Sequence, residues 1–240
     1  MHVTQDFLPS PAKIIDLPEL RDRLRVFPDR AAGGERLAEM LAGERGSEAL
    51  VVAIPAGGVP VAAALVRRLG LPPEVAPTSK ILIPGTTEAG YGAVAWDGTV
   101  VLNEALLREL RLSEAEVGRG VALTRQRVAR RVQRLRAGRP PLALGGRTAI
   151  VVDDGLASGF TMLAAAAALR GAGAGRILVA VPTAHQVAAA RLARVADGVY
   201  CANLRVGQYF AIADAYENWH DVSEEEALET LEEFRVGRAF

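Results

Sequence analysis

TAIVVDDGLASGFTML, residues 148–163, joins an apolar run to two adjacent carboxylates, Asp153 and Asp154, and then to a loop of small residues. The run from Arg147 to Asp153 predicts a buried strand, and a helix is expected from about Thr161 to Arg170. In α/β folds with parallel sheets, ligands bind beyond the carboxyl ends of the strands. The acidic pair is therefore expected at a ligand-binding site.

The rest of the chain alternates short β-rich runs with helical patterns, which predicts parallel βαβ units with both sheet faces covered. Further strands are expected at Ala49–Ile54, within Glu74–Ile83, at Arg176–Val181 and at Gly198–Ala202. Helices are expected at Val59–Leu69 and Thr183–Val195, a hairpin turning at Asp97-Gly98 within Gly92–Asn103, and a C-terminal helix whose acidic first turn follows Ser223.

One long helical pattern, Ser113 to Gly138, interrupts this alternation, with apolar residues at spacings of three, four and seven. Arginines lie between them, among them Arg125, Arg127, Arg130, Arg131, Arg134 and Arg136. The simpler interpretation is a solvated basic face on a helix packed against the core. An RNA-contacting surface is the sharper alternative, although no aromatic residues interleave the arginines.

The composition is that of one sizeable domain, taken as residues 1–240: half of the 240 residues are hydrophobic and the formal net charge is zero. A neutral balance predicts no general affinity for nucleic acid or anionic membranes. Met162–Leu169 is too short to span a bilayer, and the first residues, MHVTQDFLPSP, lack the pattern of a signal peptide. The single cysteine, Cys201, is expected in the core and suits a reducing compartment. We therefore expect a soluble cytoplasmic protein.

The residues after the apolar run suit a phosphorylated sugar. Two carboxylates can accept hydrogen bonds from vicinal hydroxyls. Residues 157–161 offer consecutive backbone N–H groups and two hydroxyls where a helix begins, which is a favourable place for an anion. The alternative is a simple turn with Ser158 as helix cap. An acidic magnesium pocket of the receiver-domain type is disfavoured because the doublet comes late in the chain and no lysine follows it.

AIVVDDGLASGFT closely resembles the 5-phosphoribosyl-1-pyrophosphate (PRPP) signature of type I phosphoribosyltransferases. Four other segments resemble a bacterial subfamily of predicted phosphoribosyltransferases: FPDRAAGGERLAEML (27–41), IPAGGVPVA (54–62), SKILIPGTTEAGYGAVAWDG (79–98) and AYENWHDVSEEEA (215–227). The resemblance implies an α/β fold with a Rossmann-like parallel-sheet core at about 31–83 and 140–204. It also implies an inserted β-hairpin and long helix at about 84–139 and a small hood from the termini, including a tail at about 205–240.

The resemblance also implies roles for individual residues. Asp153 and Asp154 would bind the ribose hydroxyls and, with Lys80, form the catalytic group, Lys80 neutralising the leaving group. The 5-phosphate would be bound by Ala157, Ser158, Gly159, Phe160 and Thr161. The pyrophosphate loop would be formed by Ala56, Gly57 and Gly58. Glu88 and Tyr91 are candidates for a flap, and Tyr216 and Trp219 for stacking on a base.

The activity implied is a pentosyl transfer: ribose 5-phosphate passes from PRPP to a nucleobase-like acceptor with inversion at C1, or the reverse pyrophosphorolysis occurs. Mg²⁺ is the implied cofactor, held mainly by PRPP and water with no direct protein ligand. The acceptor base stays open, and so does a homodimer as the assembly state.

Three departures from the family pattern bear on this activity. Ala56 stands where the subfamily commonly has arginine, so either Arg67, Arg68 or another arginine compensates, or catalysis is impaired. Phe160 stands where a smaller residue is commoner, and Ser158 replaces threonine. A non-catalytic regulatory protein that binds PRPP or a nucleotide is the main alternative, and a hydrolase using the same pocket is a third.

Overall fold

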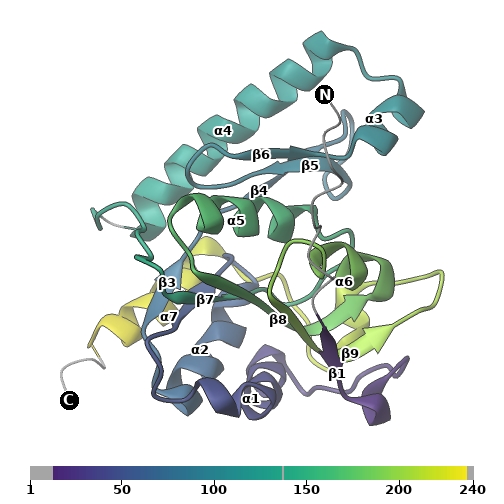
Figure 1. The fold of residues 1–240 in the computed structure, drawn as a ribbon. Helices are drawn as coiled ribbons and strands as arrows, with labels where there is room; N and C mark the ends of the chain where they lie inside the picture. The colour runs from purple at the N-terminus through teal and green to yellow at the C-terminus, as the bar shows by residue number, and fades with distance from the viewer. Residues whose placement is uncertain (1–12, 137, 237–240) are drawn as a thin grey trace, which may run out of the picture.

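The computed structural model describes residues 13–136 and 138–236 (Figure 1). Its central element is a six-stranded sheet in the order β1-β9-β8-β7-β2-β3, and every pairing in it is parallel. The strands are β1 (Ile14–Asp16), β2 (Leu50–Ala53), β3 (Pro73–Val75), β7 (Thr148–Val152), β8 (Arg176–His185) and β9 (Gly198–Arg205). The expected α/β class with a parallel sheet is confirmed.

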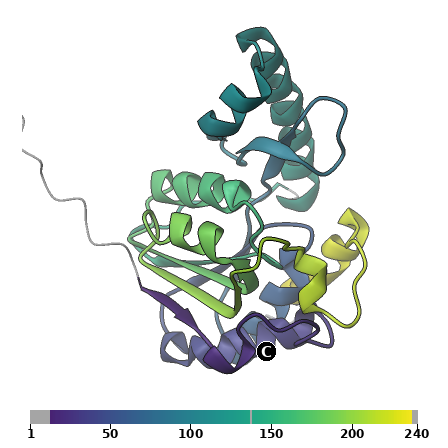
Figure 2. The same cartoon turned by 90° about the vertical axis from the view of Figure 1, so that its right-hand side faces the viewer.

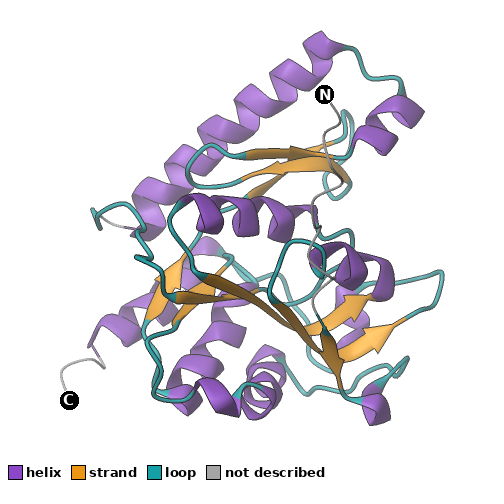
Figure 3. Ribbon diagram, in the orientation of Figure 1, coloured by secondary structure: helices purple, strands orange, loops and turns teal. Residues whose placement is uncertain are grey.

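Helices cover both faces of this sheet (Figure 3). One face carries α1 (Arg30–Met40), α2 (Gly58–Leu69) and α7 (Glu224–Val236), and the other carries α5 (Phe160–Gly171) and α6 (Gln186–Leu192). Successive strand residues alternate between the two cores: Val51 and Ile150 face α1 and α2, whereas Val52 and Val151 face α5 and α6. Burial on both faces explains why the strands read as continuous apolar runs.

A second, smaller sheet stands on the outer side of α5 (Figure 2). It is antiparallel and contains β4 (Ser79–Leu82), β5 (Gly90–Val94) and β6 (Val100–Leu102), followed by α3 (Glu104–Leu110) and α4 (Glu114–Arg136). The hairpin turn at Asp97-Gly98 lies where it was expected. Small side chains form the contact with α5, among them Ala93 and Ala164. They let this inserted sheet approach the helix closely.

Three expectations about the elements need correction. Glu74–Ile83 holds parts of two strands in two different sheets, because Pro77 lies between them and proline cannot donate to a ladder. β8 continues to His185, so α6 begins three residues later than predicted; buried Thr183 pairs with Asn203 of β9, its Oγ1 donating to Asn203 Oδ1 over 2.7 Å. The edge strand β1 was not predicted at all.

The segment after β9 returns to the sheet through a short 3₁₀ turn at Ile212–Ala215 and then forms α7; further 3₁₀ turns lie at Pro18–Leu20 and Ala42–Glu44. Ser223 begins α7 as expected: its backbone N–H donates to Glu226 Oε2 (2.7 Å), and its Oγ accepts from the Glu226 N–H (3.1 Å). Cys201 is fully buried in β9, as expected. In the described ranges no helix has the length and apolar character needed to span a bilayer. The expectation about residues 1–11 lies outside these ranges.

Candidate functional site

A cavity of about 540 Å³ opens at the carboxyl ends of β2 and β7. The loops that follow these two strands form its floor, and β4 and α4 of the inserted part form one wall. Basic and acidic side chains both line it: Lys80, Arg127 and Arg131 on one hand, and Asp153, Asp154 and Glu224 on the other. The cavity lies where parallel α/β sheets bind their ligands.

The acidic pair follows β7 directly, and Asp153 faces the cavity. Its Oδ1 accepts a hydrogen bond from the backbone N–H of Asp154 over 2.9 Å. Burial raises the pKa of the Asp153 carboxyl well above its usual range, and the negative charge of Asp154 raises it further. The positive charges of Lys80 and Arg30 act in the opposite direction. Asp153 forms no ion pair within residues 13–136 and 138–236, and its side chain is thus available to hydrogen-bond a ligand in the cavity.

Asp154 has a different environment, since it forms a buried ion pair. Arg30, the first residue of α1, donates from Nε to Asp154 Oδ2 over 3.0 Å, and the two side chains are 7% and 13% exposed. Burial raises the pKa of Asp154, while the charge and hydrogen bond of Arg30 lower it. Arg30 Nη1 also donates to the His220 carbonyl, and its guanidinium lies 3.8 Å from the Trp219 ring centre. Arg30 thus connects α1 both to the end of β7 and to the C-terminal segment.

Gly159 marks the start of α5 at the edge of the cavity, with φ at +81°. Because glycine has no side chain, α5 begins without a side-chain cap. The N–H groups of its first turn lie at the N-terminal end of the helix, which borders the cavity. Four of the five residues expected to bind a 5-phosphate line the cavity: Ala157, Ser158, Gly159 and Thr161. The Phe160 side chain is instead buried beneath the guanidinium of Arg191, which lies 4.8 Å from the ring centre and donates to the Ser158 carbonyl.

The loop after β2 brings Ala56 and Gly57 to the cavity, with a cis peptide bond between Pro55 and Ala56. Gly58 lies behind them against the end of β7, where a Cβ atom would come within 2.6 Å of the Val152 carbonyl oxygen. A Cβ on Gly57 would collide with the Asp154 carboxylate. The two glycines therefore allow this loop and the acidic pair to share one site.

Neither arginine proposed to compensate for Ala56 reaches this loop. Arg67 and Arg68 lie in the last turn of α2, about 14 Å along the axis from its first residue. Arg68 forms an exposed ion pair with Glu35 instead. Compensation by Arg67 or Arg68 is thus excluded, and compensation by another arginine stays open because Arg127 and Arg131 of α4 line the cavity.

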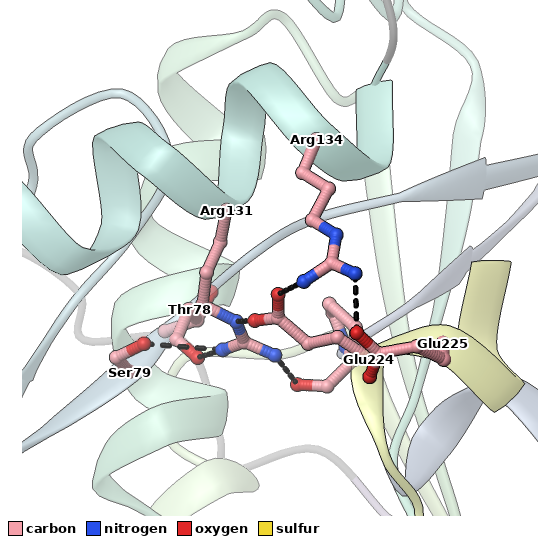
Figure 4. A network of polar contacts seen from close by, with 7 residues as sticks. Thr78, Ser79, Arg131, Arg134, Glu224 and Glu225 are labelled. Carbon is pink, nitrogen blue, oxygen red and sulfur yellow. Dashed lines mark hydrogen bonds and ion pairs between the residues drawn. The ribbon is translucent and has the colours of Figure 1, made fainter.

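Arg131 of α4 connects four segments around the cavity (Figure 4). Its Nη2 donates to the Pro55 carbonyl over 2.9 Å, and its Nη1 donates to the Thr78 carbonyl and to Ser79 Oγ, each over 3.1 Å. Its Nε donates to Glu224 Oε1 of α7 over 2.6 Å. The solvated-face interpretation of this helix was therefore wrong for Arg131. It was also wrong for Arg136, which is buried and bonded to Glu74.

Lys80 and Glu88 lie at the outer edge of the site. Lys80 is on β4, exposed, and lines the cavity, while its Nζ lies 3.5 Å from the carbonyl oxygen of Glu88. The Glu88 side chain does not line the cavity as the structure describes it, so its role in a flap stays a prediction.

The three aromatic candidates do not face the cavity in the part of the chain that the structure describes. Tyr91 is 1% exposed and packs beneath α4 against Gly120, which excludes it from a mobile flap in this conformation. Tyr216 is buried, and its hydroxyl donates to the Asp154 carbonyl over 2.6 Å. Trp219 stacks on Arg30. The expected stacking of these rings on a base is thus not supported; Tyr216 and Trp219 instead support the acidic pair.

Sequence reasoning missed Arg30, Arg127 and Arg131 as individual site residues. Arg30 lies within FPDRAAGGERLAEML, so the resemblance marked its segment but not its partner. The two arginines of α4 were indistinguishable in sequence from the five others on that helix.

Comparison with known proteins agrees with this site. Residues 96–201 match the phosphoribosyl transferase domain family. Two Mycobacterium tuberculosis proteins, provisionally named phosphoribosyl transferases MT0597 (strain CDC 1551 / Oshkosh) and Rv0571c (strain ATCC 25618 / H37Rv), are each 34% identical over 209 residues. These residues are 87% of this chain and 47% of each relative, so the chain spans about half the length of these curated relatives.

A solved structure extends the likeness over nearly the whole fold. The crystal structure of TT1426 from Thermus thermophilus is 35% identical, with a TM-score of 0.69, and the match covers 88% of this chain and 99% of that one. The family match, the relatives' names and the position of the acidic pair at the mouth of a parallel sheet agree with one another. Residues 96–201 of this chain therefore belong to the phosphoribosyl transferase domain family, and the likeness to the two named relatives extends over 209 residues.

Proposed function

We propose that this protein uses magnesium-bound PRPP to transfer ribose 5-phosphate to a nitrogenous base, or catalyses the reverse pyrophosphorolysis. One observation carries the proposal: a single cavity joins an acidic pair, the uncapped start of α5 and the glycine loop before α2. Sugar hydroxyls, a terminal phosphate and a pyrophosphate group need these three kinds of partner, and PRPP contains all three groups.

Each part of the cavity then has a role in binding. Asp153 accepts hydrogen bonds from a ribose hydroxyl, and Asp154, already paired with Arg30, has its second oxygen for the neighbouring hydroxyl. The N–H groups at the start of α5 bind the 5-phosphate, helped by the positive end of the helix dipole. Ala56 and Gly57 offer backbone N–H groups to the pyrophosphate. The Gly58 N–H donates to the Ile54 carbonyl instead, so Gly58 serves the close packing behind the loop. Ser158 and Thr161 add hydroxyl donors to the phosphate site.

In the proposed reaction, a nitrogen lone pair of the base forms a bond to C1 as the bond between C1 and the pyrophosphate oxygen breaks. The bonding electrons leave with pyrophosphate, the configuration at C1 inverts, and the proton of the attacking nitrogen passes to solvent. Negative charge therefore grows on the leaving oxygen. Lys80 lines the cavity and supplies a positive charge for it.

The donor set suits a magnesium ion held mainly by the substrate. Among the described residues, no group of three or more histidine, cysteine, aspartate or glutamate side chains could hold a metal by itself. Two carboxylates at the cavity are enough to assist an ion that keeps several waters and binds phosphate oxygens. When bound, magnesium would neutralise charge on the pyrophosphate. The protein's own contribution is to position the sugar and exclude alternative geometries.

The acceptor is expected near the C-terminal segment, against Ile212 and Val222. Both side chains are half-buried and line the cavity. Because Tyr91, Tyr216 and Trp219 face elsewhere, we propose that the base packs on aliphatic side chains and not between aromatic rings.

Ala56 favours a second candidate, a regulatory protein that binds PRPP or a nucleotide without catalysis. A methyl group in the pyrophosphate loop gives no charge to the leaving group. The two candidates share the same binding site and differ only in turnover.

Pyrophosphate release from magnesium-PRPP, measured over a panel of nucleobases, distinguishes the candidates. Catalysis predicts release that requires one of the bases, and a regulatory protein predicts saturable binding without release. Release without any base would indicate a hydrolase. The chain spans about half the length of the curated relatives, so the assay is made both on the 240-residue chain and on the full natural protein. Absence of PRPP binding in both would contradict the proposal.

A further inference from the structure

Two arginines of α4 line the cavity one helical turn apart, and only one of them is already bonded. Arg131 donates to Pro55, Thr78, Ser79 and Glu224. Arg127 is exposed and lines the same cavity, and its side chain forms no hydrogen bond or ion pair with any residue within 13–136 and 138–236. Its guanidinium is thus free for a ligand.

The position of Arg127 relative to the pyrophosphate loop follows from Arg131. The hydrogen bond from Arg131 to the Pro55 carbonyl fixes α4 beside the residue that precedes Ala56. Residues four apart on a helix lie on the same face, so Arg127 lies next to Arg131 and extends along the cavity wall. The insertion therefore supplies a cation beside a loop that has none of its own.

No acid at the cavity is left to neutralise Arg127. Glu224 is already paired with Arg131 and with Arg134. Asp154 is paired with Arg30, and Asp153 lies deep in the cavity after β7. A free guanidinium at the rim of such a cavity attracts an anionic group of the ligand, and its planar set of donors matches phosphate oxygens.

We propose that Arg127 binds the pyrophosphate group of PRPP and supplies the positive charge that Ala56 lacks. This inference rests on the proposed function of the cavity. It makes α4 part of the binding site and explains how the loop can keep alanine at position 56. Arg131 is then a positioning residue, which holds both the loop and the helix that carries Arg127.

Calorimetric titration at low ionic strength tests this with two ligands, magnesium-PRPP and ribose 5-phosphate, which lacks the pyrophosphate. Three proteins are compared: wild type, Arg127→Ala, and Arg130→Ala, in which an exposed arginine outside the cavity lining is removed from the same helix. Arg127→Ala is expected to weaken PRPP binding about tenfold or more, to leave ribose 5-phosphate binding unchanged, and to show a smaller effect at high salt. Arg130→Ala is expected to bind both ligands as wild type does.

The possible outcomes distinguish a failure of this inference from a failure of the proposed function on which it rests. If wild type binds PRPP and Arg127→Ala binds it equally well, the inference is wrong and the proposed function stands. Equal weakening for both ligands would also overturn the assignment, because it would place Arg127 elsewhere than at the pyrophosphate. If wild type binds neither ligand, the proposed function itself fails, and the inference fails with it. Ala56→Arg in the Arg127→Ala protein should restore PRPP affinity; no restoration would contradict a shared role for the two positions.

Discussion

Arg30 donates a 3.0 Å hydrogen bond to Asp154 and not to Asp153, although the two aspartates are adjacent. This single contact gives the two aspartates different environments. Asp154 is neutralised by a buried guanidinium that also bonds the His220 carbonyl. Asp153 faces the cavity with its pKa raised by burial and by the neighbouring charge. Asp154 therefore has one oxygen engaged by Arg30 and one available to the ligand, whereas Asp153 forms no ion pair within the described ranges.

Replacing Asp153 with asparagine is expected to stabilise the ligand-free protein at neutral pH and to weaken PRPP binding. The substitution removes a carboxylate whose charged form is disfavoured by burial, and it removes a strong acceptor for a ribose hydroxyl. Thermal unfolding without ligand and calorimetry with magnesium-PRPP measure the two effects.

The pH dependence of stability gives an independent check on Asp153. A carboxyl whose pKa is raised by folding keeps its proton in the native state above pH of about 4, where the unfolded chain has lost it. Stability is then lost as the pH rises from the unfolded pKa through the raised native pKa. Because burial also raises the pKa of Asp154, Asp153→Asn should reduce this loss without abolishing it. Asp221→Asn, at an exposed site, should leave the curve unchanged. Identical curves for Asp153→Asn and wild type would contradict the assignment.

Replacing Asp154 with asparagine is expected to destabilise the protein by about 3 kcal/mol, because it leaves the buried Arg30 guanidinium without a countercharge. For a chain of this size the midpoint of thermal unfolding should fall by roughly 10 °C. Arg30→Met should be destabilising too, and the double variant less so than the sum of the two single variants. Strictly additive effects would show that the two side chains do not interact.

The sequence identified the parts of this site that are local along the chain. Asp153, Gly159 and Gly57 each lie in short segments whose apolar strand, small residues and helix start are contiguous. Arg30 and Arg131 could not be assigned in this way. The first reaches Asp154 across 124 residues and the second reaches Pro55 across 76, and neither pairing leaves a local signal.

The predictions that were wrong failed for the same reason, because contacts distant in sequence determine the structure at those positions. Tyr91 is flanked by glycines, as a mobile segment can be, yet α4 covers it in the folded protein. The predicted helix at Thr183 was instead strand, because pairing with β9 outweighs local preference there. Long-range packing decided each of these positions.

Replacing Arg131 with alanine is expected to destabilise the protein and weaken PRPP binding together. The side chain is only 15% exposed, and its loss removes the hydrogen bond that fixes Pro55 and unpairs Glu224 from its more buried partner. Arg134→Ala is the matched control, because Arg134 pairs with the same glutamate at an exposed site. That control should cost at most about 1 kcal/mol and leave binding unchanged. Equal effects of the two variants in denaturant unfolding and calorimetry would exclude a special role for Arg131.

Replacing Gly58 with alanine is expected to disturb the site from the side of the loop that packs on the end of β7, without adding any group to the cavity. The new Cβ atom would lie 2.6 Å from the Val152 carbonyl oxygen and 2.9 Å from the Asp153 Cα atom, and these are backbone atoms that cannot rotate away. The loop and the end of β7 would have to separate, at a cost of about 2 kcal/mol, and the ribose and pyrophosphate sites would lose their spacing.

Gly118→Ala on α4 provides the comparison for Gly58→Ala. It adds the same methyl group at an exposed position with no neighbouring atom within 4 Å, and it should stabilise the protein by up to about 1 kcal/mol through better helix propensity. Its affinity for PRPP should equal that of wild type. A Gly58→Ala protein with wild-type stability and PRPP affinity would contradict the close approach of the two loops, and with it the joint site on which the proposed function depends.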